Sequence, residues 1–129
     1  MLLGVAACLI LPLPADDTPL GKQMEIFNDA YKAFCKETDS TKGAALAREA
    51  QLAVAKGLTE LPEMLTKMPD GPDKAKAAAE YRKMMGQAYV ALCEVEQAFL
   101  AGNTEEVAKI VGTLKEMKKA GHDKFMEEE

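Results

Sequence analysis

Four stretches of this 129-residue chain place apolar residues at every third or fourth position, which is the repeat of one face of an α-helix. Each stretch therefore predicts a helix that must bury its stripe against another helix. In chain order the first three stripes are Leu20, Met24, Phe27, Tyr31 and Phe34; Leu46, Ala50, Ala53 and Gly57; and Ala78, Tyr81, Met85, Ala88, Leu92, Val95 and Phe99. The last stretch carries a less regular stripe of Val107, Ile110, Val111, Leu114, Met117 and Phe125, with His122 at its edge.

Residues that start or stop helices separate these stretches. Thr18-Pro19 supplies an N-cap and a proline at the first helical position, and Asp39-Ser40-Thr41 ends that helix and caps the next, which runs to about Gly57. The third helix begins near Pro72, and Gly102 is a typical helix stop, after which the last helix starts. Residues 58–71 form the long loop, with a short helical turn expected within 61–68.

The connections near Asp39 and Gly102 are short, so the helices that they join must be antiparallel neighbours. The commonest residues are strong helix formers, and the length suits one domain. We therefore predict an all-α fold, an up-down-up-down antiparallel four-helix bundle that occupies residues 16–129.

Residues 1–15 carry no charge and include an apolar run that is shorter than the roughly 20 residues needed to span a bilayer. The run resembles the core of a signal peptide that ends at Ala15, although the basic segment that normally precedes it is missing, so the start is expected to be truncated. This predicts export to the periplasm. Lipid attachment at Cys8 is a weaker alternative, and an apolar tail or a misassigned start is another.

The charge pattern and the cysteines exclude several classes of function. The net charge is -5 and the lysines are scattered, which argues against nucleic-acid binding. The sequence shows no paired carboxylates in an apolar setting, no nucleophile with a base and no phosphate loop, so we do not expect an enzyme. Cys35 and Cys93 would lie on diagonal helices, too far apart for a disulfide, and we interpret both as buried or half-buried thiols. A zinc site is not expected, because the cysteines form no CxxC pair and no cluster with histidine.

His122, the only histidine, lies at the edge of the last apolar stripe, near the end of its helix, and Met24 faces inward near the start of the first helix. A lone histidine near a helix end is more often a surface or capping residue, and a methionine is more often part of a core. In this topology, however, the first and last helices are antiparallel neighbours, so both side chains reach the same end of the bundle. An imidazole and a thioether that face each other are a His/Met axial pair for haem iron, suited to electron transfer because no coordination position stays open.

The residues around this pair resemble a known family. The segment from Met24 to Lys32 is similar to the M-E-x-x-N-D-x-x-K opening of the soluble cytochrome b562 family, and His122 to Phe125 resembles the H-x-K-aromatic motif that closes it. Gly102 stands twenty residues before His122, as the inter-helix glycine does in that family. The resemblance extends from Pro19 to Met126.

The resemblance implies specific roles and a periplasmic location. Met24 and His122 would be the axial ligands of one haem, Phe27 and Tyr81 would pack on the porphyrin, and Met85 would replace a further aromatic residue. Residues 118–122 lack the CxxCH cysteines of c-type relatives, which implies non-covalent haem b. Lys118 could pair with a haem propionate, as could Lys119 or Lys22, and Gly121 stands where a bulky residue is usual.

Two other functions remain open at this stage. The chain could be a haem-free periplasmic bundle whose methionines, Met64, Met68, Met84, Met85 and Met117, offer thioethers to Cu(I). It could also be a helical interaction or structural module. For the haem carrier we expect a monomer that exchanges electrons with partner proteins, binds no nucleic acid and is not an integral membrane protein.

Overall fold

The computed structural model describes residues 18–125, and every regular element within them is an α-helix. The leader expected at residues 1–15, Cys8 and the C-terminal residues 126–129 lie outside this range. The helices are α1 (Pro19–Lys36), α2 (Ser40–Gly57), α3 (Glu63–Thr66), α4 (Pro72–Leu100) and α5 (Thr104–Phe125).

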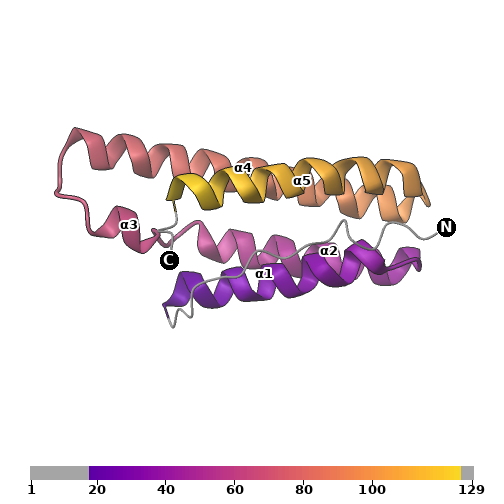
Figure 1. The fold of residues 1–129 in the computed structure, drawn as a ribbon. Helices are drawn as coiled ribbons and strands as arrows, with labels where there is room; N and C mark the ends of the chain where they lie inside the picture. The colour runs from indigo at the N-terminus through magenta and orange to yellow at the C-terminus, as the bar shows by residue number, and fades with distance from the viewer. Residues whose placement is uncertain (1–17, 126–129) are drawn as a thin grey trace.

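The four long helices lie side by side, each antiparallel to the next (Figure 1). Helices α1 and α2 form one layer and α4 and α5 form the other, while the short α3 lies in the connection between the layers. The start of α1 and the end of α5 lie at the same end of the molecule. The predicted up-down-up-down four-helix bundle is confirmed.

Side-chain caps fix the helix starts where the sequence predicted them. The Thr18 Oγ1 accepts a hydrogen bond from the Gly21 amide at 3.0 Å, and the Asp39 Oδ1 accepts one from the Lys42 amide at 2.9 Å. The turn before α5 needs a left-handed residue, and Gly102 provides it with a φ of +69°. These caps satisfy amides that the first turn of a helix otherwise leaves unpaired.

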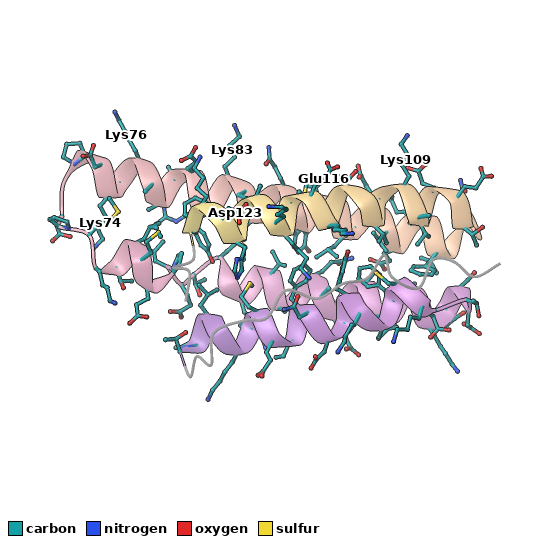
Figure 2. The ribbon with its side chains drawn as sticks, viewed as in Figure 1. Lys74, Lys76, Lys83, Lys109, Glu116 and Asp123 are labelled. Atoms are coloured by element: carbon teal, nitrogen blue, oxygen red, sulfur yellow. The ribbon has the colours of Figure 1, made fainter. Side chains whose placement is uncertain are left out.

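The bundle is polar outside and packed inside. Lysine side chains of α4 and α5, such as Lys76, Lys83 and Lys109, project away from the other helices (Figure 2). Inside, α2 presents a face of small residues, of which Ala47 and Ala50 are fully buried. Small side chains let neighbouring helices approach closely, and α2 accordingly packs tightly against both α1 and α4.

The contact between α1 and α5 differs from the other three. Close backbone approaches run along the pairs α1–α2, α2–α4 and α4–α5, but they are sparse between the described residues of α1 and α5. The first and last helices are therefore joined mainly by side chains, which leaves room between them.

The cysteines are only partly as expected. Cys93 is a half-buried free thiol, as predicted, and burial raises its pKa above the ordinary value. Cys35, however, is disulfide-bonded, so its interpretation as a thiol is wrong. The two cysteines do not pair with each other, in agreement with their positions on the diagonal helices α1 and α4.

No helix within residues 18–125 is long and apolar enough to cross a bilayer.

Candidate cofactor site

A cavity of about 110 Å³ lies between the helices at the end where α1 begins and α5 ends. Apolar side chains form most of its wall. The six residues that the sequence predicted for a site all line it: Met24, Phe27, Tyr81, Met85, Lys118 and His122. The fold thus brings together side chains from α1, α4 and α5 that are up to about a hundred positions apart in the sequence.

A hydrogen bond between α1 and α5 fixes how the two helices are aligned. The Lys118 Nζ donates to the Asn28 Oδ1 at 2.6 Å. Met24 lies four residues before Asn28 on α1, and His122 lies four residues after Lys118 on α5. Because the helices are antiparallel, both steps move about 6 Å along the bundle in the same direction, toward the end where α1 begins. Met24 and His122 therefore lie at the same level on facing helices.

His122 has an unsatisfied polar atom. Its Nε2 is buried and has no hydrogen-bond partner, and the residue lines the cavity. A buried polar group without a partner costs about 1–3 kcal/mol, so such a group calls for an explanation. Coordination of a metal ion uses the lone pair of an imidazole nitrogen, and this position of His122 fits that role.

The thioether of Met24 lies in a space that a small residue on α2 leaves open. A Cβ added to Gly57 would lie 3.5 Å from the Met24 methyl carbon and 3.0 Å from the Met85 methyl carbon. A side chain at position 57 would therefore press against both methionines. Gly57 thus keeps this part of the cavity wall free for Met24 and Met85.

Lys118 is the charged side chain of the cavity wall. Its Nζ lies 4.1 Å from the ring centroid of Tyr31 and 5.5 Å from that of Phe27, distances at which the ring faces attract a cation. Burial lowers the pKa of Lys118 from 10.5 to about 8. The ammonium group is thus held inside the bundle by an amide oxygen and two rings rather than by a carboxylate.

Tyr81 forms a neutral part of the wall. Its hydroxyl donates a hydrogen bond to the Gly57 carbonyl oxygen at 3.2 Å, and its ring packs edge-on against Phe125 with centroids 5.6 Å apart. Burial, and secondarily the charge of Glu60, raises the pKa of Tyr81 to about 12. The ring is fixed at both ends, so it offers a rigid flat surface to the cavity.

Two features of the cavity were not predicted as parts of a haem site, although Met84 was named as a possible thioether ligand of Cu(I). Asn28 was quoted only as part of a motif, yet it holds Lys118, and the four-residue spacing that it shares with the Lys118–His122 pair is the signal that could have revealed this. Met84 lies beside the predicted stripe of its helix but also lines the cavity. A Cβ on Gly121 would lie 2.7 Å from the Met84 Sδ, so this sulfur fills the space left by the glycine.

A four-helix bundle with an apolar cavity at one end, walled by an imidazole and several thioethers, belongs to the class of helical bundles that carry a cofactor in their core. The sequence model of cytochrome b562 matches residues 19–126, and the chain belongs to the cytochrome b562 family. Membership implies a haem-binding electron carrier, since this family consists of electron carriers rather than enzymes. No curated protein matches the chain.

Proposed function

We propose that the protein is a periplasmic electron carrier that binds one non-covalent haem b with Met24 and His122 as axial ligands. The observation that supports this most strongly is the buried Nε2 of His122, which lacks a hydrogen bond and lies level with Met24 in the wall of the same cavity. Family membership supports haem as the cofactor, and the alignment of α1 and α5 supports Met24 and His122 as its ligands.

The two ligands would have different tasks. The haem iron supplies a one-electron couple when it is bound. The imidazole of His122 is a good donor to both oxidation states, whereas the soft thioether of Met24 favours the ferrous state and raises the potential. If Met24 and His122 both held the iron, no coordination position would remain for a substrate, and the haem would serve electron transfer.

The remaining wall residues would seat the macrocycle and exclude water. Phe27, Tyr81 and Met85 are buried and offer apolar surface to its faces. Lys118, whose ammonium group now donates to Asn28, would be the residue that pairs with a propionate. Residues 118–122 contain no cysteine, so nothing on that segment can attach the haem covalently.

The absorption spectrum tests this proposal. Haem added to the purified chain should give the sharp Soret and α-bands of six-coordinate, low-spin haem b. Met24→Ala and His122→Ala should each abolish that form, because each removes one axial ligand. Met68→Ala is the matched control, since Met68 packs against the core but does not line the cavity. A spectrum that is unchanged in both ligand variants would refute the proposal.

We also propose that residues 1–15 are a signal peptide and that residues 16–129 form the mature domain. The support is the uncharged apolar run that ends at Ala15. Expression of the full chain in a bacterium, followed by mass measurement of the periplasmic protein, should show a mature chain that begins at Asp16; a full-length mass would contradict cleavage.

A further inference from the structure

The cavity contains more sulfur than a haem with one thioether ligand requires. Four methionines from three helices line it together with His122: Met24, Met84, Met85 and Met117. We propose that this cavity, when it holds no haem, binds one Cu(I) ion through the Nε2 of His122 and the thioethers around it. This inference goes beyond the electron carrier and does not depend on it.

The contacts of the glycines show how near these groups come to one another. The methyl groups of Met24 and Met85 approach the same point beside Gly57, within 3.5 Å and 3.0 Å. The Met84 sulfur lies against Gly121, the residue directly before His122. Met24 and Met85 thus meet beside α2, Met84 lies against the part of α5 that carries the imidazole, and all three line the same cavity as His122.

The chemistry of these ligands selects a soft ion. Thioethers are soft and uncharged, and together with imidazole they suit Cu(I). Zn²⁺ is usually held by several Cys, His, Asp or Glu side chains and Ca²⁺ by oxygen ligands, and no group of three His, Cys, Asp or Glu side chains within residues 18–125 could hold a metal ion. The donors at this site therefore favour copper in its reduced state.

The charge of the surroundings also favours a monovalent ion. The wall is mostly apolar, and the cost of moving an ion out of water into such a wall rises steeply with its charge. Lys118 adds a positive charge one helical turn from His122, and its repulsion of a divalent ion is twice that of a monovalent one. Both effects disfavour Cu(II) and Zn²⁺ relative to Cu(I).

Ordinary core packing does not explain the arrangement. Met64 and Met68 are partly buried against the core and do not line this cavity, so methionine at those positions serves packing alone. At the cavity, four methionines share the wall with His122, whose buried Nε2 has no hydrogen bond. A ligand at that nitrogen removes the cost of leaving it unpaired.

Copper transfer from a coloured chelator tests this proposal. The haem-free full chain is titrated under nitrogen against the Cu(I)–bicinchoninate complex, and loss of colour reports copper uptake. We expect one Cu(I) per chain. Since the loss of supporting groups around a metal costs about 10–100-fold in affinity, Met84→Leu and Met85→Leu should each weaken binding about tenfold or more. Leucine nearly conserves the volume of methionine, so the fold should persist, which circular dichroism checks.

Met68→Leu is the matched control and should bind copper like the parent chain, because Met68 lies outside the cavity. Chain saturated with haem should take up no copper, because haem and Cu(I) would both bind through His122. No uptake by the haem-free chain, or equal losses in Met68→Leu and Met84→Leu, would overturn the copper site. Haem binding without copper uptake would refute this inference alone, and copper uptake without haem binding would refute only the electron carrier.

Discussion

The two ends of the bundle are built on different principles. At the end where α1 meets α2 and α4 meets α5, which we name the closed end, short capped turns join the helices and rings fill the core. Phe99 packs edge-on against Phe34 with centroids 6.5 Å apart, and a Cβ on Gly43 would overlap the Phe99 ring.

The opposite end, which we name the cavity end, is packed with methionines. Unbranched thioether side chains adapt to their surroundings, and one of them, Met84, occupies the place of a missing side chain at Gly121. The His122 Nε2 has no partner there, and the ammonium group of Lys118 is held inside. The comparison suggests that the closed end supplies stability, whereas the cavity end gives up part of it to hold a cofactor.

The largest expected difference between the ends concerns truncation of a core side chain. Phe99→Ala should lower the free energy of unfolding of the haem-free chain by about 3–5 kcal/mol, because it leaves a hole in a close-packed region. Met84→Ala should cost about 2 kcal/mol or less, because its half-buried side chain already borders a cavity. Urea denaturation measures both, and equal losses would remove the distinction between the ends.

A smaller effect should follow from adding a methyl group. Gly43→Ala places a Cβ in the Phe99 ring and should destabilise the chain by about 1–3 kcal/mol. Gly112→Ala is the matched control, since that glycine is helical and exposed, with nothing within 4 Å of an added Cβ. It should stabilise the chain by about 0.5–1 kcal/mol through helix propensity. Thermal unfolding of the two variants should therefore move in opposite directions, and a shift of the same sign would contradict the packing described at Gly43.

The smallest effect should be the change with pH in the contribution of Lys118, at the cavity end, to the free energy of unfolding. The pKa of Lys118 is about 8 in the folded chain, against 10.5 for the unperturbed group, so between these values the unfolded chain binds more protons. The contribution of Lys118 to the free energy of unfolding must then rise as the pH rises above about 8. In Lys118→Met this contribution is absent.

Urea denaturation at about pH 7.5 and about pH 9.5 provides the measurement. The stability of the parent chain relative to Lys118→Met should increase between these two values. The raised pKa of Tyr81, about 12, affects both chains alike and cancels in the difference. A difference that stays constant would show that Lys118 is solvated rather than buried.

The sequence predicted most of the fold because the helix boundaries depend on local signals. Thr18, Asp39 and Gly102 act on the backbone within a few residues of themselves, and each does in the structure what its position suggested. The level of Met24 with His122 was also predictable, since it follows from topology and helical rise. These inferences needed no knowledge of side-chain packing.

What the sequence did not reveal depends on contacts between distant segments. The Asn28–Lys118 hydrogen bond joins residues on α1 and α5, and the matching four-residue spacings that point to it become visible only when the two helices are compared. Met84 was left out of the helix stripe because periodicity describes one face, whereas the cavity is lined from several helices and includes a residue that flanks that face. The disulfide of Cys35 was missed because the argument from distance tested only the pair Cys35–Cys93.

The sparse backbone contact between α1 and α5 affects the order in which the helix pairs can assemble during folding. The other three pairs consist of helices that follow one another along the chain, apart from the short α3, so they assemble from nearby segments. The pair of α1 and α5 contributes few close backbone contacts to this assembly. The other three pairs can therefore form without a cofactor between the first and last helices.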